Sequence, residues 1–343
     1  MIEFGSDFHF IPDLLLASNN RNFPESKFRY YANGRHALEA LILQEKWQRI
    51  WMPAYFCYEV IESVANTGIQ IKLYDDHPLR NDDESLISSL QFKDGDVLLR
   101  VNYFGLRDIR TNKQLSVPVI EDHTHDIISN WAINSDASWC IASVRKTLPV
   151  AAGGILWSPV NACLPEQLPI SCECENVSAM RYEAMKMKGI YLSHGGDKSV
   201  FREMYISSEN VLDNIAISGM DTISKGIVNN IDLCNWTSYR KANWEYTNIL
   251  LRSRFNILQP QSVLGVNPFS LVIYFEDSLE RDRFRNYLIN HNIYPAILWR
   301  LPSESLFAEA LDFSQRMISI HCDARYNIND IEKMCSIINS YYD

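Results

Sequence analysis

Residues 117–156 read VPVIEDHTHDIISNWAINSDASWCIASVRKTLPVAAGGIL, and they contain two short apolar runs that each lead into charged residues. The first run, residues 117–120, leads into Glu121 and Asp122, which is typical of a buried strand with a carboxylate at its carboxyl end. The second run, residues 139–143, leads through a charged turn to Lys146. In an open α/β sheet, ligands bind at the carboxyl ends of the strands. We therefore expect Asp122 and Lys146 at the same rim of a sheet.

A carboxylate and a lysine that converge in this way suit pyridoxal 5′-phosphate. The lysine amine can form a Schiff base with the cofactor aldehyde, and the aspartate can keep the pyridine nitrogen protonated so that the ring accepts electrons. Taken singly, a lysine in a turn is usually a solvated charge, and an aspartate after a strand is usually a turn former or a helix cap. Ser143, three residues before Lys146, and Gly153-Gly154, which begins seven residues after it, make the pair more specific.

With these motifs the sequence resembles the DegT/DnrJ/StrS aminotransferases, a family within fold type I of the pyridoxal phosphate-dependent enzymes. The resemblance runs from about Tyr31 to Trp157 and resumes thinly in about the last hundred residues of the chain. It implies that Asp122 holds the ring nitrogen, that His125 lies near the ring hydroxyl and that Lys146 binds the cofactor.

A further motif, Asn33-Gly34-Arg35-His36-Ala37-Leu38, resembles the family segment that opens a helix. Apolar residues recur at helical spacing after it, so Asn33 is predicted to cap a helix. The free N–H groups of a helix amino terminus, next to the small Gly34, form a ready seat for phosphate. The resemblance therefore implies that Gly34, Arg35 and Ser143 hold the cofactor phosphate, whereas an ordinary capped helix is the alternative.

Two more cofactor contacts rest on the resemblance. The family places the aromatic side chain that stacks on the cofactor ring at the position of Cys57, so we expect Phe56 or a neighbouring tyrosine to cover the ring instead. Asn102, three residues before Gly105, is expected to hydrogen-bond the ring oxygen. The alternatives are that the aromatic residues are simply core and that Asn102 forms a turn after a strand.

Strand and helix patterns alternate along the chain. Residues 49–53 and 69–74 are predicted strands on either side of a helical pattern, which is a βαβ unit and predicts parallel pairing. We expect an α/β protein with a three-layer α/β/α large domain and a mainly parallel sheet, as in fold type I, followed by a small α+β C-terminal domain.

The length of 343 residues allows one large domain and a smaller one. We expect an N-terminal arm over residues 1–28, a cofactor-binding large domain over 29–235, and a connecting helix with the small domain over 236–343. Helices are predicted over residues 85–92, 181–191, 200–217, 230–255, 278–290 and 329–341, and strands over 96–101, 269–275 and 316–321. Arg300, in the last part, is a candidate for gripping a substrate carboxylate, but an exposed ion pair is the favoured interpretation.

Composition and charge exclude several classes of partner and compartment. The formal net charge of -10 and the lack of a Lys/Arg block argue against nucleic acid, and no apolar run is long enough to span a membrane. The amino terminus lacks the pattern of a signal peptide, and the eight scattered cysteines predict reduced thiols in the cytoplasm. The close pair in Cys172-Glu173-Cys174 has the wrong spacing for a zinc knuckle, so a plain loop is favoured and no metal is expected.

The expected function is transfer of an amino group from an amino acid donor, with glutamate as the favoured donor, to a keto or aldehyde acceptor. The resemblance favours a nucleotide-linked keto sugar as acceptor and a symmetric homodimer. However, the family's Gly-Tyr-Asn-Tyr-Arg loop has no clear counterpart near residues 226–232. The alternatives are a dehydratase or lyase on the same scaffold, a pyridoxal phosphate-binding protein without turnover, and an unrelated α/β enzyme.

Overall fold

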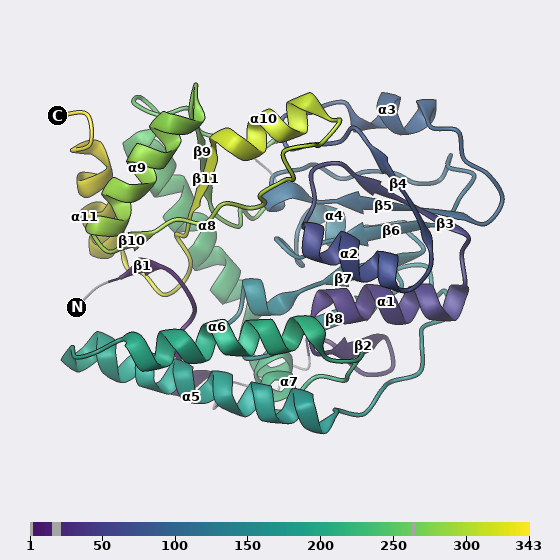
Figure 1. Ribbon diagram of the computed structural model, residues 1–343, viewed down its shortest axis with the longest axis horizontal. Helices are drawn as coiled ribbons and strands as arrows, with labels where there is room; N and C mark the ends of the chain where they lie inside the picture. The colour runs from purple at the N-terminus through teal and green to yellow at the C-terminus, as the bar shows by residue number, and fades with distance from the viewer. Residues whose placement is uncertain (1–2, 16–21, 263–264) are drawn as a thin grey trace.

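The computed structural model describes residues 3–15, 22–262 and 265–343, and within them a seven-stranded sheet has the strand order β2-β8-β7-β6-β5-β3-β4 (Figure 1). The pairs β3–β4, β3–β5, β5–β6 and β6–β7 are parallel, whereas β8 is antiparallel to both of its neighbours. The predicted mainly parallel sheet is therefore confirmed. Its strands are β2 (Phe28–Tyr31), β3 (Arg49–Pro53), β4 (Gln70–Tyr74), β5 (Asp96–Val101), β6 (Val119–Asp122), β7 (Trp139–Ala142) and β8 (Gly154–Trp157).

Both faces of this sheet are covered. Successive side chains of a strand point to opposite faces. Ile120 of β6 belongs to the core shared with α1 (Gly34–Glu45) and α2 (Tyr58–Asn66), whereas Val119 belongs to the core beside α3 (Asp83–Ser89). Asp122, two residues after Ile120, consequently faces the α1 side of the sheet.

Helix α1 begins as predicted. The side chain of Asn33 accepts a hydrogen bond from the backbone N–H of His36 (2.8 Å), which makes Asn33 the N-cap. Gly154, at the start of β8, lies directly against this helix end: a Cβ atom there would be 1.9 Å from the carbonyl oxygen of Asn33 and 2.9 Å from the nitrogen of Gly34. Both are backbone atoms and cannot rotate away. Close approach of two backbones therefore requires glycine at position 154.

Gly154→Ala is expected to lower the free energy of unfolding by about 3 kcal/mol, because β8 or the first turn of α1 must move. Gly226→Ala is the matched control. Position 226 lies in α7 (Thr222–Asn230), where an added Cβ atom meets nothing within 4 Å. Alanine favours a helix interior, so that change is expected to stabilise by about 0.5–1 kcal/mol. Urea unfolding midpoints measure both, and a wild-type midpoint for Gly154→Ala would contradict the close approach.

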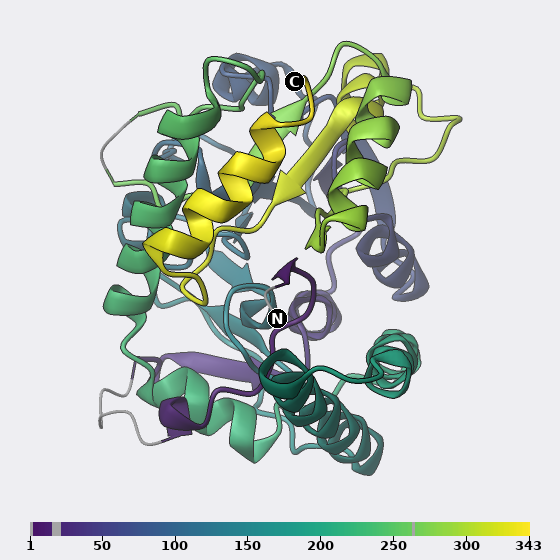
Figure 2. The same cartoon turned by 90° about the vertical axis from the view of Figure 1, so that its left-hand side faces the viewer.

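The C-terminal part forms the predicted small α+β domain. Strands β9 (Leu271–Tyr274) and β11 (Met317–Ile320) pair antiparallel. The long helix α8 (Leu233–Leu251) leads into this part and contacts both β9 and the last helix, α11 (Ile328–Asn339). In Figure 2 the light-green to yellow elements lie above the teal helices of the middle of the chain. The other elements of this part are α9 (Ser278–Asn290), β10 (Ile293–Tyr294) and α10 (Ala308–Arg316).

Helices α5 (Cys172–His194) and α6 (Ser199–Asn214) pack as a pair, and α5 corrects one expectation. The segment Cys172-Glu173-Cys174 is the first turn of α5 and not a loop. Ser171 caps it by accepting a hydrogen bond from the Cys174 backbone N–H (3.1 Å), and acidic side chains in the first turn suit the positive end of the helix dipole. Helices α7, α10 and the short α4 (Asn130–Ile133) were not predicted.

The described part of the amino-terminal segment, residues 3–15 and 22–28, lies along other parts of the fold. Its strand β1 (Phe4–Gly5) pairs parallel with β10, and the Phe10 N–H donates to the Met185 carbonyl oxygen on α5 (3.1 Å). Residues 1–2 and 16–21 of the expected arm lie outside the described residues. Domain limits at residues 28 and 235 stay predictions. Among the described residues, none of the helices combines the length and the apolar character that a membrane crossing requires.

Candidate functional site

A cavity of about 360 Å³ lies at the carboxyl ends of β6 and β7, beside the first turn of α1. It brings together side chains that are far apart in the sequence. The predicted site residues that line it are Gly34, Arg35, Phe56, Asp122, Ser143 and Lys146. The expected convergence of Asp122 and Lys146 at one rim is thus what the structure shows.

Asp122 ends β6 with one carboxylate oxygen engaged. The backbone N–H of Thr124 donates to its Oδ1 (2.8 Å), whereas Oδ2 makes no hydrogen bond among the described residues. The Thr124 hydroxyl in turn accepts from the backbone N–H of Ser143 (2.9 Å), so it ties the end of β6 to the end of β7. Oδ2 is therefore available to a protonated nitrogen in the cavity. Sequence reasoning missed Thr124, although it lies within the same motif.

Lys146 ends a short 3-10 helix, η3 (Val144–Lys146), that follows β7. Its backbone N–H donates to the carbonyl of Ser143 (3.1 Å), and its side chain is half-buried. Within the described residues its ammonium group makes no ion pair and instead lies 5.2 Å from the ring centroid of Trp299. The amine is consequently held in the cavity without a carboxylate partner.

The first turn of α1 meets Ser143 at close range. A Cβ atom at Gly34 would lie 3.0 Å from the Cβ atom of Ser143, so glycine at this position lets Ser143 approach the helix end closely. The helix itself offers no carbonyl to the N–H groups of Gly34 and Arg35. The Arg35 guanidinium is engaged elsewhere, because it donates to Asp213 (2.6 Å) and to the Leu212 carbonyl (3.3 Å). Arg35 therefore brings its backbone N–H to this corner with a side chain that is already neutralised.

Arg145 and Glu209, which also line the cavity, were not predicted. Arg145 donates to both carboxylate oxygens of Glu209, and Arg181 donates to one of them (3.0 Å). Burial, the largest single effect, would raise the pKa of Glu209. The charge and hydrogen bonds of Arg145 together with the charges of Arg181 and Lys146 outweigh burial and lower this pKa to about 2. Glu209 lies on α6 and had no sequence signal, since only the packing of α6 brings it to Arg145.

His125 and Asn102 are not among the residues that line the cavity. His125 is buried; Phe104 N–H donates to its Nδ1 (2.9 Å), and Nε2 has no partner among the described residues. Burial lowers the pKa of His125 well below its usual value, and the charges of Lys146 and Arg240 act in the same direction. A neutral imidazole that accepts at Nδ1 carries its proton on Nε2, which is thus an unused buried donor.

Asn102 has the partners of a turn residue. Its side-chain oxygen accepts from the backbone N–H of Arg107 (3.3 Å), and its amide lies 3.5 Å from the hydroxyl of Ser129. These contacts match the alternative prediction for Asn102, a turn residue that follows a strand. Arg300 is exposed, as the favoured interpretation expected, but the ion pair expected with it is wrong, because Arg300 makes none within the described part of the chain.

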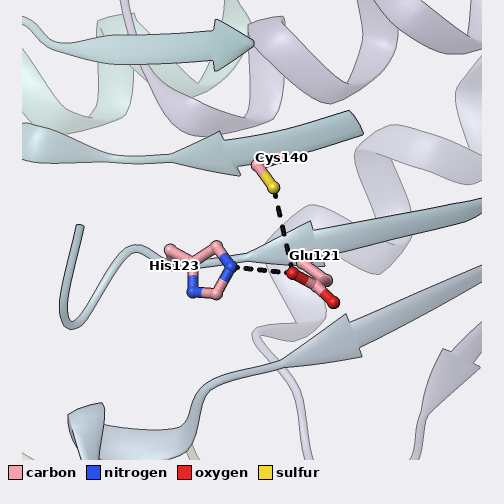
Figure 3. Close-up of side chains that lie close together, drawn as sticks. All are labelled: Glu121, His123 and Cys140. Carbon is pink, nitrogen blue, oxygen red and sulfur yellow. Dashed lines mark hydrogen bonds and ion pairs between the residues drawn. The ribbon is translucent and has the colours of Figure 1, made fainter. Parts of the chain in front are cut away.

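A buried cluster of Glu121, His123 and Cys140 has the composition of a metal site (Figure 3). The Glu121 carboxylate lies 3.0 Å from His123 Nε2 and 3.9 Å from Cys140 Sγ. It also accepts from Ser135 (2.6 Å) and Asn112 (2.7 Å), so hydrogen bonds already occupy its oxygens. Burial raises the pKa of the Cys140 thiol well above its usual value. The arrangement is that of a hydrogen-bonded core cluster on the face of β6 opposite Asp122.

A second cavity of about 530 Å³ adjoins the first, and Arg145, Lys146, Glu209 and Leu298 line both. The amino-terminal segment contributes Asp7 and Phe8 to its wall, and the C-terminal part contributes Tyr294 and Arg325. Lys146 therefore borders two cavities.

No protein-family model matches the chain, and no curated protein sequence matches it either. Solved structures do. PseC of Helicobacter pylori, an aminotransferase involved in the biosynthesis of pseudoaminic acid, is 13% identical with a TM-score of 0.66, and the match covers 99% of each chain. Spr1654 of Streptococcus pneumoniae, provisionally described as a sugar aminotransferase, is 13% identical in its apo-form with a TM-score of 0.66, over 99% of this chain and 97% of that one.

A DegT DnrJ EryC1 StrS aminotransferase from Brucella abortus is 16% identical with a TM-score of 0.60, over 92% of this chain and 85% of that one. At these identities the matches establish the fold. The chain has the fold of these aminotransferases, which is fold type I, over nearly its whole length. The expected fold class is thereby confirmed.

Proposed function

We propose that this chain is a pyridoxal 5′-phosphate-dependent aminotransferase of the DegT/DnrJ/StrS type. The observation that carries the proposal is that Asp122 and Lys146 line one cavity together with the amino terminus of α1. The fold supports it, because the structures that match include aminotransferases and a PLP-form and a PMP-form of Spr1654.

The residues around the cavity fit this cofactor in three respects. Asp122 offers a carboxylate oxygen without a hydrogen bond, and Lys146 an amine without an ion pair, among the residues that the structure describes. The glycine at position 34 brings Ser143 close to the amino terminus of α1, and a hydroxyl beside helix N–H groups suits a phosphate. The buried Nε2 of His125 is a donor that still needs an acceptor. Each end of the cofactor would thus meet a group of matching chemistry.

When bound, the cofactor supplies an electron sink for the carbon atoms of the substrate. The residues of the chain hold it and move protons. Lys146 would hold the aldehyde carbon through Nζ and, once displaced by the donor amine, carry a proton from the donor's α-carbon. Asp122 would keep the proton on the pyridine nitrogen through Oδ2. His125 would donate from Nε2 toward the ring oxygen.

The phosphate would be held by the backbone N–H groups of Gly34 and Arg35 and by Ser143. The Arg35 guanidinium is paired with Asp213, so the helix end carries more of this task than the side chain does. We keep Phe56 and Asn102 as proposed cofactor-binding residues. Asn102 does not line the cavity, so it would act on the cofactor only through the residues that do.

Donor and acceptor would enter in turn through the larger cavity that Lys146 borders. We propose glutamate as the donor, the choice that the family resemblance favours. Arg145, Arg181 and Arg325 line this cavity, but Glu209 and Asp323 already accept hydrogen bonds from them. We propose a keto sugar, linked to a nucleotide, as the acceptor and a cytoplasmic homodimer as the working form. Matches to sugar aminotransferases support the choice of a sugar.

Absorption spectra of the purified protein between about 300 and 500 nm test the proposal. Pyridoxal phosphate is expected to give a yellow band from its bond with lysine, and glutamate is expected to replace it with a band at shorter wavelength. Adding 2-oxoglutarate should restore the yellow band, because the half-reaction is reversible. A protein that stays colourless with added cofactor would refute the proposal, and a yellow protein indifferent to glutamate would refute the donor.

A further inference from the structure

The indole ring of Trp299 presents its face to the amine of Lys146. Trp299 lies between β10 and α10 in the C-terminal part, yet it lines the same cavity as Asp122 and Lys146. The Lys146 Nζ atom lies 5.2 Å from the ring centroid, in the position of a cation over an aromatic face. A flat group bonded to Nζ would therefore lie next to the face of the indole ring.

Three other rings hold the indole in this orientation. Its centroid lies 5.8 Å from that of Tyr55, 5.5 Å from that of Phe56 and 5.6 Å from that of His125, which is tilted by only 21° from the indole plane. The backbone is held as well, because the hydroxyl groups of Tyr55 and Ser314 donate to the carbonyls of residues 298 and 299. The face of Trp299 is thus placed before any ligand binds.

The other candidates for covering a ring are less well suited. Cys57 has a thiol with no aromatic face, and its Sγ lies 3.0 Å from a carboxylate oxygen of Glu59. Phe56 is 2% exposed, against 8% for Trp299, and meets the indole at 59°. Phe56 lines the cavity too, but it presents less surface there than Trp299 does and packs against the indole.

We propose that Trp299 supplies the aromatic face that covers the pyridine ring of pyridoxal phosphate. This inference rests on the proposed function. The role is the one that the family resemblance gives to position 57, here moved to the C-terminal part of the chain. Stacking of two flat rings is favourable beyond the area that it buries. As a consequence, the cofactor would bridge the sheet that carries Asp122 and the C-terminal segment that carries Trp299.

The test compares the dissociation constant of pyridoxal phosphate for four proteins: wild type, Trp299→Leu, Trp299→Phe and Phe56→Leu. The constant is measured by equilibrium dialysis and, independently, from the yellow band. Trp299→Leu is expected to weaken binding on the order of tenfold, whereas Trp299→Phe keeps an aromatic face and should lose about threefold or less. Phe56→Leu should lose less than Trp299→Leu.

A rescue variant separates stacking from packing. Cys57→Tyr, introduced into Trp299→Leu, is expected to recover at least half of the lost affinity on a logarithmic scale, because it returns an aromatic face to the cavity. Urea midpoints verify that each variant is folded. If Trp299→Leu does not fold, Trp299→Met takes its place with the same expected loss.

The outcomes distinguish a failure of the role of Trp299 from a failure of the proposed aminotransferase function. A wild-type protein that binds no pyridoxal phosphate overturns the proposed function and the role of Trp299 together. Tight binding by the wild type and equally tight binding by Trp299→Leu overturns only the role of Trp299. A larger loss for Phe56→Leu than for Trp299→Leu also overturns it and assigns the ring cover to Phe56.

Discussion

Lys146→Ala is expected to abolish the yellow absorption of the bound cofactor and to slow the half-reaction with glutamate by at least about 10³-fold. The reason is that alanine removes the amine that bonds the aldehyde carbon and carries the proton. In the structure this amine has no carboxylate partner among the described residues, so no ion pair competes with its bond to the cofactor. Spectra and stopped-flow mixing with glutamate measure the two effects.

Two further variants control this experiment. Lys146→Arg keeps the positive charge over the Trp299 ring but cannot form the bond, so it is expected to lose as much as Lys146→Ala. Lys186→Ala removes an exposed lysine of α5 whose charge is paired with Glu183 (3.7 Å), and it should leave the spectrum unchanged. A wild-type spectrum in Lys146→Ala would eliminate Lys146 as the attachment site.

Asp122→Asn is expected to slow the same half-reaction by about 10³-fold while the cofactor stays bound. Asparagine keeps an oxygen for the Thr124 N–H group, so the local geometry is retained. What is lost is the negative charge that keeps a proton on the pyridine nitrogen, and without that proton the ring is a poor electron sink. Single-turnover rates with glutamate, measured on protein saturated with cofactor, check this expectation.

Asp94→Asn serves as the control, because Asp94 is an exposed acid in the turn before β5 and its loss should leave the rate unaltered. A rate in Asp122→Asn within about threefold of the wild type would contradict the role of Asp122. Loss of bound cofactor with an unchanged rate at saturation would assign Asp122 to binding alone.

Much of the large domain followed from local patterns. The runs that became β3, β4, β5, β6 and β7 are apolar and short, and Asn33 carries the side chain that a helix start needs. Once those strands are parallel neighbours, their carboxyl ends meet at one rim. The meeting of Asp122 with Lys146 could therefore be expected from spacing and topology.

Local patterns were weaker in the middle of the chain. Helix α5 begins nine residues before the expected helix, because Ser171 and two acidic side chains stabilise a first turn whose cysteines suggested a loop. Helix α7 was missed, although Asp221 caps it by accepting from the Ser224 N–H (2.8 Å). In both helices the capping bond, and not an apolar stripe, marks the start.

The sequence alone predicted that Asp122 and Lys146 each follow a strand, that Asn33 caps a helix and that glycines accompany both motifs. These features depend on neighbours a few positions away. The surroundings of Lys146 depended on three-dimensional packing. Glu209 reaches Arg145 from α6, and Trp299 reaches Lys146 across more than 150 residues of chain, a separation that no periodic pattern encodes. Contacts of this kind form only when whole elements pack against one another, since burial selects the elements and the elements then bring their side chains together.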